Sequence, residues 1–290
     1  MVRYLKGVTL PTLELTQANV VPTRVSSLEE VRELLATDGA AIVSGVATEA
    51  DAAALAAEIL GDRLIRLGRQ FEASKRHYEA ETTRIDHLPA DPRGRKKQYT
   101  PPSERMHPHN DGFSFGDFAP DYLFLWCEHP AVPSGGDSYL VDAYKLVQLL
   151  AEDDETRELA AFCWAQDIDQ SEPSAPAPYV APIARRVASG RVQVRSNPYF
   201  MAMEGPMESA HEPLVRRWQE LVVAARDEGP TFRVEAGDMI CADNYRLLHG
   251  RYAYEDVTRT LYSIWGWTTE GVAVPNETLD ISAPVVPTAR

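Results

Sequence analysis

"TFRVEAGDMICADNYRLLHGRYAYEDVTRTLYSIWGWT", residues 231–268, is the stretch that decides the fold class. Its two ends, residues 231–243 and 258–268, are rich in β-branched, aromatic and aliphatic residues, and an Ala-Gly-Asp turn interrupts the first of them. Short runs of this kind, bounded by turn residues, are typical of strands or hairpins. The stretch therefore predicts that the C-terminal half of the chain is built on β-structure.

The same pattern recurs upstream of this stretch. Strands or hairpins are expected at residues 122–127, 137–142 and 185–195. Two amphipathic helices interrupt them, one around residues 143–162 and one around residues 212–226. We therefore expect a mainly β fold with flanking helices, of the α+β class, whose core is a β-sandwich or jelly roll.

The N-terminal part has an α/β character over about residues 24–75. Ser27 and Glu30 form the pattern of a capping box in front of an apolar helical stripe. A short buried strand follows in AAIVSGV, and Thr48 is expected to open an Ala-rich helix that ends near Gly61. This segment is expected to precede the β core, which spans about residues 100–270.

A proline-rich segment at about residues 166–186 contains DQSEPSAPAPYVAPIA and has little periodicity. It predicts a long loop, and long loops in compact domains often serve as lids. The sequence contains no internal repeat. The length of 290 residues fits one large domain or two ordinary ones.

The composition limits the class of protein and its partners. With 44% hydrophobic and 25% charged residues, it is typical of a globular protein. No apolar run reaches the roughly 18 residues of a membrane span, and the N-terminus lacks a secretory signal, so no membrane partner and a cytoplasmic location are expected. The net charge of -14 repels phosphate backbones, which disfavours nucleic acid. A small molecule is the expected partner, and a homo-oligomer stays open.

Residues 105–115, RMHPHNDGFSF, contain a histidine and an aspartate two positions apart, His109 and Asp111. With 7 histidines and 43 acidic residues among 290, this spacing is expected about once by chance. It occurs a second time at His77 and Glu79, in a polar stretch where a solvated face is expected. The spacing alone therefore does not identify a metal site.

The ligand preferences of iron suggest that His109 and Asp111 could bind one metal ion together. Residues two apart in a strand point to the same side, so His109 and Asp111 can face one cavity. An iron ion that also binds a chelating cosubstrate and O2 accepts only three protein ligands, and two histidines with one carboxylate meet that requirement. His249 is the candidate for the third ligand. Arg259 could pair with a dicarboxylate cosubstrate, and Arg251 is the alternative.

Together these motifs resemble the taurine dioxygenase and clavaminate-synthase-like group of Fe(II)/2-oxoglutarate dioxygenases. Within that group the C-terminal part is similar to gamma-butyrobetaine and trimethyllysine dioxygenases. The matching pieces cover roughly residues 24–270 and are, in order, the N-terminal helix with GAAIVSGV, HPHNDGFSF, PDYLFLWCEHPAVPSGGDSYLVDA, VRSNPY, and GDMICADNYRLLHGR followed by Arg259. The resemblance implies a single catalytic domain with a double-stranded β-helix, or jelly-roll, core.

The resemblance also implies roles for individual residues. His109, Asp111 and His249 would bind Fe(II), with 2-oxoglutarate and O2 as cosubstrates. Arg259 would pair with the distal carboxylate of 2-oxoglutarate, and Ser138 stands where family members often have a threonine whose hydroxyl assists that carboxylate. The implied reaction hydroxylates an unactivated C–H bond of a small substrate, such as an amino acid or an amine-bearing carboxylic acid, and releases succinate and CO2.

Four residues are expected to contact the substrate. Phe113 and Phe115 alternate along the segment that follows the first ligands, which places them near the pocket. Asn197 and Tyr199 lie where the butyrobetaine-like relatives place substrate-facing groups. His107 is expected to be an exposed turn residue, and the alternative is that it supports the ligands from behind.

Three expectations remain open at this point. The same iron chemistry could produce desaturation or cyclisation instead of hydroxylation. A non-catalytic jelly-roll protein could use the same ligands for a structural metal, although it would not need a dicarboxylate anchor. The basic run from Arg93 to Lys97 is expected to be a solvated loop, and it could instead guide an anionic substrate.

Overall fold

The computed structural model describes residues 14–68, 71–173, 178–203 and 208–276. The strands are β1 Thr23–Val25, β2 Ala40–Val43, β3 Leu64–Leu67, β4 Phe71–Ser74, β5 Tyr122–His129, β6 Ser138–Asp142, β7 Asp167–Asp169, β8 Val180–Pro182, β9 Ala184–Arg186, β10 Val192–Val194, β11 Met239–Asp243, β12 Leu247–Arg251 and β13 Thr260–Thr268. The α-helices are α1 Leu28–Thr37, α2 Glu49–Leu60, α3 Lys75–Asp86, α4 Ala143–Glu152, α5 Arg157–Ala165 and α6 Glu212–Glu228, and 3-10 helices span Leu15–Ala18, Gly61–Arg63, Phe113–Phe118 and Glu208–His211. None of the helices in the described ranges combines the length and the apolar content that crossing a membrane requires.

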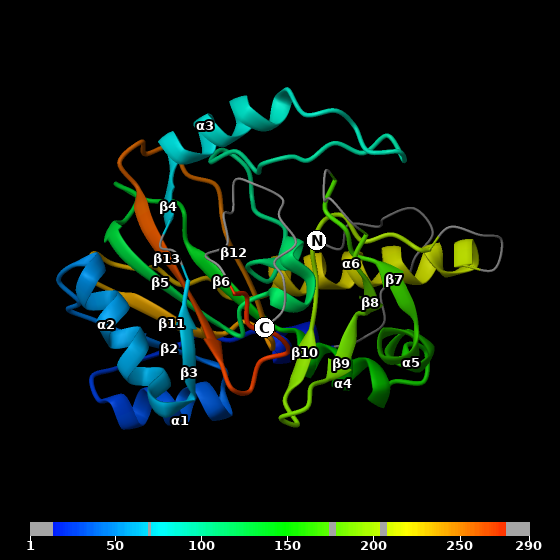
Figure 1. The fold of residues 1–290 in the computed structure, drawn as a ribbon, viewed down its shortest axis with the longest axis horizontal. Coiled ribbons are helices and arrows are strands. Elements are labelled where there is room, and N and C mark those ends of the chain that lie inside the picture. The colour runs from blue at the N-terminus through cyan, green and yellow to red at the C-terminus, as the bar shows by residue number, and fades with distance from the viewer. Residues whose placement is uncertain (1–13, 69–70, 174–177, 204–207, 277–290) are drawn as a thin grey trace.

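A seven-stranded sheet forms the centre of the described structure. Its order is β1-β2-β11-β5-β13-β3, and β4 also pairs with β13. Two-stranded sheets are formed by β12 with β6, by β10 with β9 and by β7 with β8. Helices α1 and α2 lie along one side of the large sheet, whereas α4, α5 and α6 gather at the opposite side of the molecule (Figure 1). The chain is thus a mixed α/β structure in which helices flank the sheets.

The N-terminal helices begin where the capping residues predict. The Ser27 hydroxyl accepts a hydrogen bond from the backbone N–H of Glu30 and donates one to its carboxylate. Thr48 makes the same pair of bonds with Asp51. The apolar faces of α1 and α2 then pack against the large sheet, in a core that includes Val31, Ile59, Phe124 and Ile264. This part of the prediction is confirmed.

The C-terminal strands pass back and forth between two sheets. β11 lies between β2 and β5 in the large sheet, β12 leaves to pair with β6, and β13 returns to the large sheet beside β5. A buried apolar cluster that includes Ile42, Leu140, Ile240 and Leu261 fills the space between these sheets. The sequence interval between β11 and β13 therefore crosses the molecule, and it carries His249 to the opposite sheet from β13.

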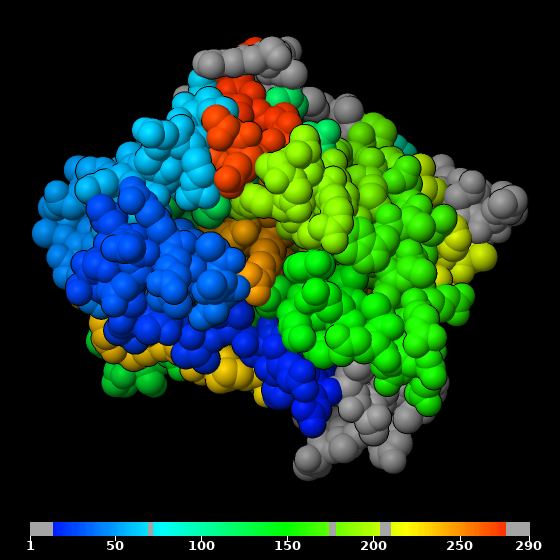
Figure 2. All heavy atoms as spheres, turned by 90° about the horizontal axis from the view of Figure 1, so that it is seen from below, coloured from blue at the N-terminus to red at the C-terminus, as the bar shows by residue number. Residues whose placement is uncertain are grey.

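A side chain in the turn between β11 and β12 links two segments that are distant in the sequence. Arg246 donates to the carbonyl of Thr37 at 2.6 Å and to the carboxylate of Asp142 at 2.8 Å. Figure 2 shows this face, where the blue N-terminal segment and the green middle segment meet with orange atoms between them. Arg246 thus ties the end of α1 to the end of β6.

The segment around residues 143–162 was predicted as one helix and is two. α4 ends at Glu152, and α5 begins at Arg157. The Asp153 carboxylate accepts a hydrogen bond from the backbone N–H of Glu155, and the Thr156 hydroxyl donates to the carbonyl of Leu150. Side chains of Asp and Thr that bond to nearby backbone groups compete with helical hydrogen bonds, which explains the break.

Two further segments differ from their predictions. The run from residue 231 to 243 turns at Gly237, but its two arms do not pair: Phe232 forms a bridge with Ser138 instead. The proline-rich segment is not a continuous loop, because β7 and β8 pair antiparallel at its two ends. Its central residues 174–177 lie outside the described residues.

Candidate metal centre and cavity

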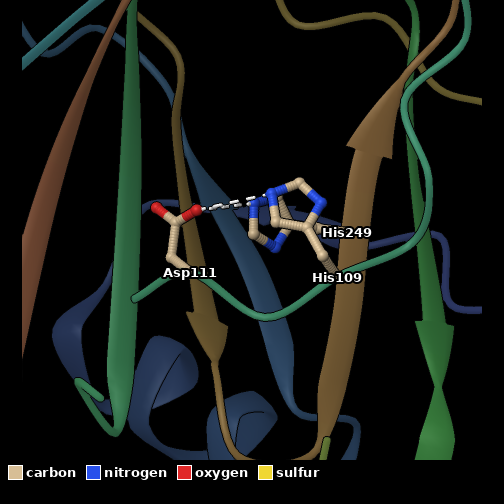
Figure 3. Close-up of side chains that lie close together, drawn as sticks. All are labelled: His109, Asp111 and His249. Carbon is tan, nitrogen blue, oxygen red and sulfur yellow. Dashed lines mark ion pairs between the residues drawn. The ribbon is translucent and has the colours of Figure 1, made fainter. Parts of the chain in front are cut away.

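The structure brings His109, Asp111 and His249 together. Their ligand atoms lie within 4.8 Å of one another. The Oδ1 atom of Asp111 lies 3.6 Å from Nε2 of His109 and 3.4 Å from Nε2 of His249. Figure 3 shows both imidazoles directed at the same carboxylate oxygen. Residues distant in the sequence therefore form one compact set of two nitrogens and one oxygen.

Backbone pairing fixes the two histidines side by side. His109 and His249 form an antiparallel bridge in which each backbone N–H donates to the other residue's carbonyl, at 3.2 and 3.0 Å. Asn244 holds the next ligand, because its side chain accepts from the backbone N–H of Asp111 at 2.9 Å and donates to the Asp111 carbonyl at 3.0 Å. The spacing of the ligands is therefore set by backbone hydrogen bonds rather than by the side chains alone.

The second oxygen of Asp111 is held by strand β13. Its Oδ2 atom accepts a hydrogen bond from Nε1 of Trp265 at 2.8 Å and from the Ser263 hydroxyl at 3.1 Å. Burial alone would raise the pKa of Asp111, but hydrogen bonding to the two imidazoles and their charge hold that pKa well below its usual range. The residue is thus an anionic carboxylate with one oxygen fixed and one directed at the histidines.

Hydrogen bonding and burial prepare the two histidines for metal binding. Nδ1 of His109 donates to the carbonyl of His107 at 2.9 Å, so Nε2 is the ring nitrogen that faces Asp111. Burial and the neighbouring His109 lower the pKa of His249, so its imidazole is neutral near neutral pH. Neutral imidazoles and an ionised carboxylate are the forms that bind metal.

The geometry fits a divalent first-row metal. Such ions hold nitrogen and oxygen ligands at about 2.0–2.2 Å, so neighbouring ligands on one octahedral face lie about 3 Å apart. The separations of 3.4 and 3.6 Å exceed this value by only a few tenths of an ångström. All three residues also line a cavity of about 210 Å³, so the remaining coordination positions face open space.

His107 does not match its prediction as an exposed turn residue. It is half-buried, its imidazole lines the cavity, and burial lowers its pKa to about 3. Its carbonyl also orients His109, as described above. Pro108, between the two histidines, favours a turn in the sequence. In the structure, His107 and His109 both line the cavity.

Strand β13 supplies one wall of the cavity with alternate residues. The residues that line it from this segment are Arg259, Leu261, Ser263 and Trp265. Their partners on the other face, such as Ile264, pack in the core against α2. Period-two alternation thus places a charged group, an apolar group and both Asp111 donors along one line.

The two candidate arginines differ in what they already bind. Both line the cavity. The terminal nitrogens of Arg251 donate to five backbone carbonyls, those of Thr100, Pro101, Pro102, Glu104 and Tyr252. Arg259 is 5% exposed, donates to the Gly136 carbonyl at 3.2 Å and stacks on Tyr254, and among the described residues it forms no ion pair with a carboxylate. A buried guanidinium of this kind is suited to an incoming carboxylate, whereas both terminal nitrogens of Arg251 are occupied by backbone carbonyls.

The Gly-Gly turn before β6 makes room for Arg259. A Cβ on Gly136 would lie 2.5 Å from Nε of Arg259, and the residue has a φ of +66°. Glycine satisfies both demands, because it has no Cβ and tolerates positive φ. Ser138, two residues later, lines the cavity with Arg259 and is 5% exposed.

The predicted substrate contacts divide into two groups. Phe113, Phe115 and Tyr199 line the cavity, and the Phe113 ring lies 6.2 Å from those of both His109 and Tyr199. Asn197 is fully buried and is not part of the cavity lining. Its amide donates to the carbonyl of Gln170 and accepts from the backbone N–H of Tyr199. Asn197 is therefore placed to support Tyr199 rather than to touch a ligand.

Several residues that line or support the cavity wall were not predicted from the sequence. The basic run is not a solvated loop: Arg93, Arg95 and Lys97 are turned inward and only about one fifth exposed or less, at 19%, 18% and 12% of the side chain. His77 also lines the cavity, whereas Glu79 is exposed as expected. Residues 91–97, DPRGRKK, contain no apolar alternation, so the inward turn of the basic side chains had no signal in the sequence.

Comparisons with known proteins place the chain in a family. The family model described as taurine catabolism dioxygenase TauD, TfdA family matches residues 9–265. No curated protein matches the chain by sequence. Similar solved structures include asparagine oxygenase in complex with Fe(II), 2S,3S-3-hydroxyasparagine and succinate, at 18% identity, a TM-score of 0.57 and coverage of 83% of this chain and 78% of that chain.

Two other oxygenases share the fold. PvcB, an Fe, alpha-ketoglutarate dependent oxygenase from an isonitrile synthetic pathway, has 14% identity, a TM-score of 0.53 and coverage of 83% of this chain and 80% of its own. The non-heme iron oxygenase OrfP in complex with Fe and alpha-ketoglutaric acid has 15% identity, a TM-score of 0.51 and coverage of 83% and 79%. With a family match that spans most of its length, the chain belongs to the TauD, TfdA family of dioxygenases.

Proposed function

We propose that this dioxygenase uses Fe(II), 2-oxoglutarate and O2 to hydroxylate an unactivated C–H bond of a small amino acid or amine-bearing carboxylic acid, with release of succinate and CO2. The observation that carries the proposal is the pairing of two features in one cavity. These are a set of two histidines and one carboxylate that faces the cavity, and a buried arginine that forms no ion pair with a carboxylate of the described residues. A structural metal site would need neither.

The residues have distinct roles in this proposal. His109, Asp111 and His249 would hold Fe(II), which when bound supplies the site for O2 and the oxidising power of the reaction. Arg259 would pair with the distal carboxylate of 2-oxoglutarate, and the Ser138 hydroxyl would hydrogen-bond to it. Three protein ligands leave room for a bidentate cosubstrate and O2, so a fourth side-chain ligand would block the reaction.

The remaining wall of the cavity is apolar and aromatic, which suits exclusion of water during oxidation. Phe113, Phe115 and Tyr199 would contact the substrate and direct one carbon toward the metal. The hydroxylated amino acid bound in the asparagine oxygenase complex supports a substrate of this chemical class. The closer likeness to gamma-butyrobetaine and trimethyllysine dioxygenases stays a prediction.

We also propose that the two sheets form a double-stranded β-helix in a single catalytic domain, and that the described parts of the segment, residues 166–173 and 178–186, contribute to a cover over the cavity. The passage of β11, β12 and β13 from sheet to sheet and back supports the first part. The position of Glu172 in the cavity lining supports the second.

Anaerobic spectroscopy tests the proposal directly. Addition of Fe(II) and 2-oxoglutarate to the apo protein should give a visible metal-to-ligand charge-transfer band, and His109→Ala should abolish both the band and succinate formation. His77→Ala is the matched control, because His77 lines the same cavity outside the ligand set. Absence of the band in folded wild-type protein would contradict the proposed function.

A further inference from the structure

A buried ion pair lies in the cavity wall away from the metal ligands. Nζ of Lys97 lies 3.1 Å from Oε2 of Glu172, and their side chains are 12% and 8% exposed. Both residues line the cavity. Removing two charges from water costs several kcal/mol per ion, and a buried pair often stabilises a fold no better than apolar residues would. Stabilisation of the fold alone therefore does not explain why this ion pair is buried.

The other charges in the cavity already have partners or proposed ligands. Among the described residues of the lining, the remaining charged side chains are Asp111, Arg251 and Arg259. Asp111 belongs to the metal centre, the Arg251 guanidinium is bound by carbonyls, and Arg259 faces the proposed cosubstrate. Lys97 and Glu172 are thus the two charges left to meet a substrate.

The pair is held in place by neighbouring contacts. Arg93 lies 3.2 Å from the carboxylate of Asp169, close in the chain to Glu172. Arg95 donates to the Tyr199 carbonyl at 2.8 Å, and the Tyr199 hydroxyl accepts from the backbone N–H of Gln98 at 2.9 Å. These bonds join the segment that carries Lys97 to the segments that carry Glu172 and Tyr199, so the two charged groups are pre-positioned.

We propose that the substrate is a zwitterionic amino acid whose carboxylate is bound by Lys97 and whose ammonium group is bound by Glu172. The two side chains exchange their mutual ion pair for pairs with the substrate. This inference rests on the proposed function, because it takes the same cavity as the substrate site. A substrate with both charges leaves neither residue unpaired, whereas a dicarboxylic acid or a simple amine leaves one of them buried without a partner.

The surroundings of Glu172 favour this reading. Burial raises the pKa of Glu172 even though Lys97 opposes the shift, so the carboxylate is poorly solvated and gains from a second cation. The Tyr199 hydroxyl bonds to the backbone of Gln98, the neighbour of Lys97, and the Phe113 ring lies 6.2 Å from the rings of both Tyr199 and His109. The head group would therefore be held beyond the aromatic rings, and the side chain of the substrate would face the metal centre.

Calorimetry on the Fe(II)- and 2-oxoglutarate-loaded protein without O2 tests the inference. The proteinogenic L-amino acids are titrated first, followed by two analogues of the best binder: the amine that lacks its carboxylate and the acid that lacks its ammonium group. Each analogue should bind about 10- to 100-fold more weakly, the value of one charge-assisted hydrogen bond. Lys97→Met should erase the difference between the amino acid and the amine, and Glu172→Gln should erase the difference between the amino acid and the acid.

The controls separate recognition from a structural role. Lys96→Met and Glu79→Gln remove exposed charges of the same kinds and should leave all affinities unchanged. The double variant Lys97→Met with Glu172→Gln keeps the side-chain sizes and should bind all three compounds alike. The inference is overturned if no amino acid binds, if the analogues bind as well as the amino acid, or if the variants weaken all three compounds equally. The proposed function is judged separately by the charge-transfer band, which is recorded before any amino acid is added.

Discussion

Replacement of Trp265 by phenylalanine tests how Asp111 is kept ready for metal. The indole Nε1 is one of two donors to the carboxylate oxygen that points away from the histidines, at 2.8 Å. Phenylalanine keeps an aromatic ring in the same buried place, 5.9 Å from Phe115 in the wild type, but has no donor. The carboxylate can then rotate about its Cβ–Cγ bond, held only by the Ser263 hydroxyl at 3.1 Å.

The expected loss can be estimated from the bond removed. A hydrogen bond to a charged group contributes about 1.5–3 kcal/mol, and removal of an outer partner of a metal ligand weakens metal binding by about 10- to 100-fold. These two figures agree, since tenfold corresponds to about 1.4 kcal/mol. We expect Trp265→Phe to bind Fe(II) about 10- to 100-fold more weakly in anaerobic titration, with a weaker dependence of melting temperature on added metal.

Trp267→Phe is the matched control. Trp267 lies two residues further along β13 and is equally buried, but its Nε1 donates to the Phe118 carbonyl at 2.9 Å, away from Asp111. Both variants lose the same atoms and both lose one hydrogen bond. If the two variants bind Fe(II) with the same affinity, the reasoning about Asp111 is wrong, because the loss would reflect packing alone.

Three other variants test separate parts of the structure. Arg259→Ala should raise the 2-oxoglutarate concentration needed for half-maximal succinate formation by at least about tenfold; an unchanged value would transfer the anchor to Arg251. Gly136→Ala should weaken 2-oxoglutarate binding, because its Cβ would meet Arg259 at 2.5 Å, whereas Gly190→Ala, at a φ of +87° with open space around it, should affect stability alone; equal 2-oxoglutarate affinity in both would refute the steric argument. Hydrogen bonds lower the pKa of Asp238 in the folded state, so its stabilising contribution is complete above the usual carboxyl pKa of about 4 and is lost as pH falls through the lowered value. The difference in unfolding free energy between wild type and Asp238→Asn, measured by denaturant titration, should therefore shrink below about pH 4, and a constant difference would contradict the pKa direction.

Much of the fold could be predicted because its signals are local. The capping hydroxyls of Ser27 and Thr48 act on residues three positions away, and each lies directly before the helix it caps. The run of β13 is rich in β-branched and aromatic residues, so it could be predicted as a strand from its composition. The spacing of His109 and Asp111 occurs about once by chance, so it did not identify the metal ligands alone. The ligands could be grouped only when His249 and Arg259 were considered with that pair.

The failed predictions depend on contacts that the sequence does not contain. Whether Asp153 breaks a helix depends on the direction its side chain takes, which propensity alone does not fix. His107 looked like a turn residue because the cavity that buries it is made by distant segments. The pairing of Lys97 with Glu172 joins positions 75 residues apart, and no local pattern relates them.

The face of β13 that lines the cavity fixes the distance between the metal centre and the proposed cosubstrate anchor. Arg259, which would fix the far end of the cosubstrate, directly precedes β13, and β13 itself carries the two donors that fix Asp111. The pairing of β13 with β5, including its register shift between Thr260 and Leu261, holds these residues at their spacing. The charged pair proposed to select the substrate sits instead on irregular segments outside this sheet. New substrates could therefore be acquired by changes in those segments while the distance between oxidant and cosubstrate anchor stays constant.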